Sequence, residues 1–328
     1  MQKIIFIVIL ILLTVVINAE SVNASEYNLC SDTSSYKSFI QKYREYSHQF
    51  TDAELDQQFD EAAAYIDEHP EGKHATNLRR KITKKLNIRF LLKNIDEEEL
   101  NVEIVEINKH KKYTEKELLF KDTEVGDISA LILIPKGHGP WPAIIGLHGH
   151  GDSKEIFKKN YFAKDLVKKG FVVIMPDLRA MCCDNSEEKI SEKLLANGFT
   201  LMGLRMYEAH LLIEYLKSKN FVNKKIGIIG HSGGSELANL VVRVSEDIKA
   251  GVSDFQSDML DLCWDRKDCI IPSPNCRTHC QTIPALSYYM PQINDESTLE
   301  IPFLKFDYKY PESNDKEEVI NFFVENLK

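Results

Sequence analysis

The chain has 328 residues, of which 43% are hydrophobic and 28% are charged, and its formal net charge is −9 at pH 7. A chain of this length and composition can bury one large hydrophobic core. The negative charge, with no basic arm or stripe, argues against nucleic acid as the main partner, because phosphate binding depends on clustered Lys and Arg side chains.

The first 24 residues have the layout of a secretory signal peptide. Lys3 provides a positive start, the stretch 4–17 is almost wholly apolar, and the small residues Ala19 and Ala24 follow it. The apolar stretch is shorter than the roughly 20 residues that a membrane-spanning helix usually needs. We therefore expect cleavage after Ala19 or Ala24, no stable membrane span afterwards, and a secreted or periplasmic protein.

Export to an oxidising compartment would permit disulfides among the seven cysteines. Four of them fall in the polar segment 260–283, where one or two bridges would stabilise a loop that buries little apolar surface. Zinc is the alternative for Cys276, His279 and Cys280, but their spacing matches no familiar ligand pattern, and no metal or other cofactor is predicted. The odd count makes Cys30 the candidate unpaired thiol, while disulfide pairing and oligomeric state stay open.

Residues 25–95 are predicted to form an N-terminal helical extension ahead of a main domain at 96–328. The extension is polar, and its apolar residues recur at helical intervals, as at Phe39, Tyr43 and Tyr46. This spacing predicts two or three amphipathic helices that form a cap or packing layer.

The main domain begins with strand patterns and continues with alternating strands and helices. Antiparallel strands are expected first, at 102–107, 117–120 and 129–134. Four apolar runs then follow, with helical patterns around 154–169, around 191–219 and after residue 232; the runs are 143–147, 171–175, 226–229 and 249–253. This alternation predicts an α/β fold with a mostly parallel sheet and helices on both faces, in which ligands bind beyond the carboxyl ends of the strands.

The sequence GHSGG, Gly230 to Gly234, lies between an apolar strand pattern and a helical pattern. A Gly-x-Ser-x-Gly turn in this context places a serine hydroxyl at the tip of a strained corner, where glycines allow close backbone approach. Ser232 is therefore the candidate nucleophile. The alternative is a chance Gly/Ser turn, which the flanking strand and helix make the weaker interpretation.

A second glycine-containing stretch, HGHGD at His148 to Asp152, follows the strand pattern 143–147. Backbone amides of Gly149 and His150 could turn toward a negatively charged oxygen there and form an oxyanion hole with the amide of Gly233. His148 and His150 would then shape the turn rather than act as bases. The alternative is an ordinary strand-to-helix turn with a packed histidine.

The order of these motifs resembles the α/β-hydrolase superfamily, in particular its dienelactone-hydrolase and acetyl-xylan-esterase-like members. The likeness covers roughly residues 100–255: HGHGD after one strand, MPDLRA (Met175 to Ala180) at the end of the next, and GHSGG after a third. It implies an α/β-hydrolase fold and serine-mediated hydrolysis of an ester or related acyl bond. By this likeness Ser232 is the nucleophile, Gly233 and the residues after His148 supply the oxyanion hole, and Asp177 and Arg179 are structural at the rim.

The C-terminal part of the chain departs from that pattern. The last expected strand, 301–308, is followed almost at once by a closing helix at 315–327, so the usual last strand and its histidine loop are expected to be missing. His279 is the only histidine after the serine and becomes the predicted base. Asp254, directly after the strand 249–253, is the predicted acid, with Asp307 or Glu312 as alternatives that would change the chain order of the triad.

Two further interpretations remain open at this stage. One is a catalytically degenerate hydrolase-like protein that binds a ligand instead of cleaving it, because fold does not settle function. The other keeps the enzyme but gives it a carbohydrate-linked ester in place of a small-molecule ester. The aromatic residues that could line a cleft for a sugar, or simply pack in the core, are Tyr288, Tyr289, Phe303, Phe306, Tyr308 and Tyr310.

Overall fold

A computed structural model of the chain describes residues 33–95, 100–121, 123–181, 186–253, 284–305 and 313–328. In this part of the chain, eight strands form one sheet in the order β1-β2-β3-β5-β4-β6-β7-β8. No helix among the residues described is long and apolar enough to cross a bilayer.

The sheet has an antiparallel half and a parallel half, as the strand patterns predict. β1 (Val102–Lys109), β2 (Tyr113–Phe120) and β3 (Ile128–Pro135) pair antiparallel, and β3 also pairs antiparallel with β5. The other five strands run parallel to one another; they are β4 (Trp141–Leu147), β5 (Val172–Pro176), β6 (Val222–Gly230), β7 (Ile248–Ser253) and β8 (Phe303–Lys305). β8 is the edge strand of this half, and α14 (Ser313–Leu327) follows it in the described chain.

Helices cover both faces of the parallel half. Successive side chains of a strand point to opposite faces, and both sets of side chains are apolar here, so each face packs against helices. On β4, Ile145 and Leu147 belong to a core cluster with α9 (Leu201–Lys217) and α10 (Gly233–Val244). Ile144 belongs to a second cluster on the other face, with α6 (Lys154–Asn160), α7 (Ala163–Lys168) and α14. A parallel sheet buried in this way has near-continuous apolar strands, which explains the apolar runs in the sequence.

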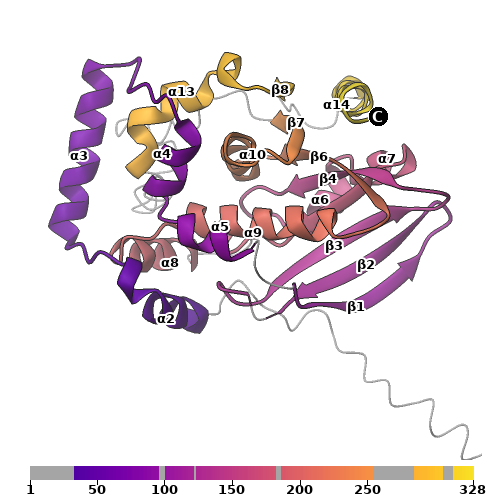
Figure 1. Cartoon of the computed structure of the whole chain (residues 1–328), viewed down its shortest axis with the longest axis horizontal. Helices are drawn as coiled ribbons and strands as arrows, with labels where there is room; N and C mark the ends of the chain where they lie inside the picture. The colour runs from indigo at the N-terminus through magenta and orange to yellow at the C-terminus, as the bar shows by residue number, and fades with distance from the viewer. Residues whose placement is uncertain (1–32, 96–99, 122, 182–185, 254–283, 306–312) are drawn as a thin grey trace, which may run out of the picture.

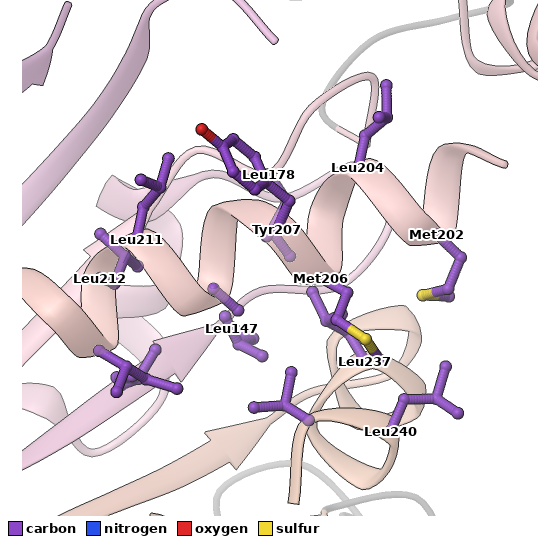
Figure 2. Close-up of a cluster of buried hydrophobic side chains, with 14 of the residues drawn as sticks. Leu147, Leu178, Met202, Leu204, Met206, Tyr207, Leu211, Leu212, Leu237 and Leu240 are labelled. Atoms are coloured by element: carbon purple, nitrogen blue, oxygen red, sulfur yellow. The ribbon is translucent and has the colours of Figure 1, made fainter. Parts of the chain in front are cut away.

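Helix α9 is buried on almost every side. Figure 2 shows Met206 of α9 beside Leu147 of β4 and Leu237 of α10, so the C-terminal end of β4 and the start of α10 share one packed environment. This packing fixes the sheet edge at which β4 and β6 end.

The N-terminal helices pack onto the same core. Helix α2 (Thr33–Lys42) contacts α8 (Ser186–Leu195), α4 (Leu78–Lys85) contacts α10, and α5 (Arg89–Ile95) contacts α9. Helix α3 (Asp52–Glu68) lies at the margin farthest from β1 (Figure 1), beside the short helical segments Pro284–Tyr289 and α13 (Met290–Asn294). The described part of this region holds four α-helices, whereas the sequence pattern predicted two or three.

Two helices predicted as continuous are each divided. The pattern 154–169 forms α6 and α7, because Phe162 between them has a left-handed φ of 59°. The pattern 191–219 forms the end of α8 and the whole of α9, with Gly198 at φ 74° between them. A residue at positive φ cannot continue a right-handed helix, so both predictions of a single helix were wrong.

Candidate active site

Ser232 stands at the corner between β6 and α10. Its backbone has φ 49° and ψ −119°, a conformation that costs a non-glycine residue energy and that the surrounding turn must impose. A Cβ on Gly230 would lie 2.1 Å from the carbonyl oxygen of Gly234, so the turn closes only with glycine there. Ser235 reinforces the closure, since its hydroxyl donates to the carbonyl oxygen of Gly230 at 2.7 Å.

The turn after β4 lies directly against this corner. A Cβ on Gly149 would come within 2.8 Å of the Cβ of Ser232, and the amide of His231 donates to the carbonyl of Leu147 at 2.9 Å. The two motifs that the sequence singled out, HGHGD and GHSGG, are therefore adjacent at the carboxyl ends of neighbouring strands. This is the edge at which a parallel α/β sheet binds ligands.

Helix α10 begins at Gly233 and directs its first amides toward this edge. The amides of Gly234 and Ser235 are occupied by the carbonyl oxygens of His231 and Ser232, each at 2.8 Å. Among the described groups, the amide of Gly233 remains for an oxyanion at the positive end of the helix dipole. The geometry can therefore stabilise negative charge beside the serine.

His148 is fully buried and ties the turn after β4 to the segment after β5. Its Nε2 accepts the amide of Leu178 at 2.8 Å, so its Nδ1 carries the hydrogen and donates to the carbonyl oxygen of Gly149 at 2.8 Å. Burial lowers the pKa of His148, which keeps the ring neutral. Both nitrogens are occupied, so this ring shapes the turn and has no nitrogen free to act as a base.

His150 lies over the first residue of α10 and makes an ion pair behind it. A Cβ on Gly233 would come within 2.4 Å of Cε1 and 2.6 Å of Nδ1 of this ring. Its Nε2 is 3.2 Å from each carboxylate oxygen of Glu187 on α8. Glu187 also pairs with the buried Arg205 of α9, with Nη1 to Oε1 at 2.9 Å.

Glu236, one turn after the serine, carries a buried carboxyl oxygen. Its Oε1 is inaccessible to solvent and has no hydrogen-bond partner among the described residues. Burial raises the pKa of Glu236 to about 7; the nearby Arg205 opposes the rise and Glu187 adds to it. This carboxyl therefore holds its proton to a higher pH than a solvent-exposed glutamate does.

Asp177 and Arg179, which the resemblance gives structural roles, both make ion pairs. The Nζ of Lys154 lies 2.5 Å from Oδ2 of Asp177, and Nε of Arg179 lies 2.5 Å from Oε1 of Glu208. Arg179 is buried. Its carbonyl oxygen accepts Nε of Arg205 at 2.8 Å, which connects it to the charges behind the site.

The predicted base and acid, His279 and Asp254, lie outside the described residues, as do the alternatives Asp307 and Glu312 and all seven cysteines. The described part of β7 ends at Ser253, whose backbone is in register with Gly230 of β6. The chain therefore continues into residue 254 from the strand next to the serine corner. Of the six aromatic residues considered for a sugar cleft, Tyr289 is buried in the core and Tyr288 packs edge-on against Tyr65.

Sequence reasoning missed three charged residues that lie close to His150 or to its partner: Glu187, Arg205 and Glu236. One signal was present: Arg205 interrupts the apolar helical run of α9, and a charge on a buried face requires a partner. The partner itself could not be identified from sequence, since Glu187 is on a different helix.

Comparisons with known proteins agree with this geometry. Residues 128–259, which include β3 to β7 and both glycine motifs, match the model of the dienelactone hydrolase family. Esterase EstD of Thermotoga maritima is 29% identical over 136 residues, which cover 40% of this chain and 30% of that protein. The putative hydrolase YtaP of Bacillus subtilis is 25% identical over 142 residues, covering 39% and 45% respectively. The match thus spans less than half the length of each relative.

Solved structures extend the likeness in fold beyond that segment. Acetyl xylan esterase 1 from Thermoanaerobacterium sp. superposes with a TM-score of 0.54 at 14% identity, covering 85% of this chain and 99% of that one. The acetyl xylan esterase from Paenibacillus sp. R4 gives 0.55 at 12% identity, with 80% and 99% covered. At these identities the comparison establishes the fold, and it confirms the predicted mostly parallel sheet with helices on both faces.

Proposed function

From the match of residues 128–259 to the dienelactone hydrolase family and the likeness in fold to two acetyl xylan esterases, we propose that this chain is a serine hydrolase that cleaves carboxylic esters through an acyl-enzyme. One observation carries the proposal. Ser232 occupies a strained corner beside Gly149 and at the N-terminus of α10, where an attacking hydroxyl and oxyanion donors can meet at one carbonyl group.

The proposed reaction has two halves. His279 takes the proton of Ser232 as its Oγ bonds to the ester carbonyl carbon, and the amides of Gly233, Gly149 and His150 stabilise the oxyanion. The bond to the alcohol then breaks, and His279 returns the proton to the leaving oxygen. Water attacks the acyl-enzyme with the same assistance and releases the carboxylic acid.

Asp254 is proposed to orient His279 and to stabilise its charged form. The support is positional: residue 254 follows the end of β7, which pairs with the end of β6 beside the serine corner. Asp307 and Glu312 are the other candidates for this role. The proposal also includes secretion after signal cleavage and disulfides in the segment 260–283. A carbohydrate-linked ester is the alternative substrate.

The test is hydrolysis of p-nitrophenyl acetate, p-nitrophenyl butyrate and an acetylated xylo-oligosaccharide by the mature protein and by the variants Ser232→Ala, His279→Ala and Asp254→Asn. We expect the intact protein to be active and the serine and histidine variants to lose several orders of magnitude in kcat. If only the serine variant loses activity, the base has been misassigned. An intact protein that cleaves no ester would favour the degenerate binding protein instead.

A further inference from the structure

The imidazole of His150 is fixed between the expected oxyanion site and a buried ion pair. One edge of the ring packs on Gly233, where even a methyl group would overlap Cε1 at 2.4 Å. Its Nε2 lies 3.2 Å from the carboxylate of Glu187. The side chains of His150 and Glu187 are 27% and 17% exposed, so water competes little for the pair.

A buried arginine, Arg205, holds Glu187 in place. Its Oε1 lies 2.9 Å from Nη1 of Arg205, whose side chain is 1% exposed and whose Nε donates to the carbonyl oxygen of Arg179 at 2.8 Å. A buried guanidinium requires a counter-charge and holds it in a defined place. The pair with Arg205 therefore restrains the carboxylate at its place beside His150.

The contacts from Arg205 through Glu187 to His150 reach two of the proposed oxyanion donors. His150 carries one donor amide in its own backbone, and its ring packs on Gly233, which carries another. We infer that Glu187, fixed by Arg205, is a positioning residue that sets the spacing of these amides through the ring of His150. The inference rests on the proposed ester hydrolysis, in which the amides stabilise the developing oxyanion.

A positioning role predicts a specific kinetic effect. Removing a donor outright costs on the order of 100- to 1,000-fold in kcat, so a loosened donor pair should cost roughly 10- to 100-fold. The substrate carbonyl carries little negative charge before attack, so KM should change less than about twofold. A boronic acid that forms a tetrahedral adduct with Ser232 should lose affinity by about the same factor as kcat.

The experiment compares Glu187→Ala, Glu187→Gln, His150→Ala and Glu192→Gln on p-nitrophenyl acetate, with phenylboronic acid as the inhibitor. Glu187→Ala should show the full loss in kcat and in boronate affinity, and Glu187→Gln should recover part of both, because its amide oxygen can still accept Nε2–H of His150. His150→Ala keeps the Glu187–Arg205 pair and should match Glu187→Ala, which covers the case in which that variant does not fold. The control Glu192→Gln changes an exposed residue of the same helix and should leave both readings at the intact level.

Two results would overturn this inference alone. One is an active intact protein whose His150→Ala and Glu187→Gln variants keep full kcat. The other is a loss of kcat in His150→Ala with no loss of boronate affinity. An intact protein that neither cleaves the ester nor binds the boronate would overturn the proposed function, and this inference with it.

Discussion

Replacing Glu236 by Gln should remove a pH dependence from the stability of the protein. Burial raises the pKa of this carboxyl from its ordinary 4.5 to about 7 in the folded chain, and its Oε1 is shielded from solvent and has no partner in the described part of the chain. Between those values the unfolded chain releases the proton while the folded chain retains it. The free energy of unfolding therefore falls as the pH rises from 4.5 to 7, and above pH 7 the loss is complete.

The size of the effect follows from the shift. A difference of one pKa unit corresponds to about 1.36 kcal/mol, so a rise from 4.5 to about 7 corresponds to about 3 kcal/mol. A neutral glutamine occupies nearly the same volume and has no proton to lose. Relative to the intact protein, Glu236→Gln should therefore gain about 3 kcal/mol between pH 4.5 and pH 8.

The assay is urea denaturation of the two proteins at several pH values across that window. Other titrating groups contribute equally to both proteins and cancel in the difference. As a control, Glu318→Gln makes the same substitution at an exposed position of α14, where no buried carboxyl is removed. A Glu236→Gln difference that stays constant within about 1 kcal/mol would mean that the carboxyl ionises as it does in water, and the burial argument would be wrong.

Two further substitutions test the geometry of the site and of the sheet. Ser232→Gly should be more stable than Ser232→Ala by about 1 kcal/mol in urea denaturation, because glycine relieves the strain at φ 49° while alanine keeps its Cβ; equal midpoints would mean that the corner is unstrained. Gly251→Ala should lower the free energy of unfolding by about 1–3 kcal/mol, since its Cβ would lie 2.4 Å from Cδ2 of Phe303 and push β8 away from β7. An unchanged midpoint for Gly251→Ala would show that Phe303 moves freely.

The parts of the fold that were predictable are those set by local pattern. Apolar runs such as Ile144, Ile145 and Leu147 fill both faces of a parallel sheet, so they indicate buried strands without reference to partners. The serine corner was predictable for the same reason, since a strand, a glycine-bounded serine and a helix are consecutive in the chain.

The errors arise where tertiary packing, not local sequence, determines where a helix ends and which side chains pair. Nothing between Asn160 and Ala163 is glycine or proline, so no residue type there indicates the left-handed φ of Phe162 that separates α6 from α7. Gly198 was a visible signal, but the helical periodicity on either side of it outweighed that signal. Pairing of Glu187 with His150 depends on where α8 packs, which periodicity does not specify.

One of the N-terminal helices, α2, also contacts the network of buried ion pairs beside the site. Tyr36 of α2 is buried, and the guanidinium of Arg179 lies 5.7 Å from the centre of its ring. Arg179 pairs with Glu208 and, through its carbonyl, holds Arg205, the residue that fixes Glu187. Because paired charges weaken when water reaches them, α2 strengthens this set of contacts by covering it. The helical region at 33–95 and the sheet therefore stabilise one another through a shared core, and Tyr36 covers the ion pairs on which the geometry beside Ser232 depends.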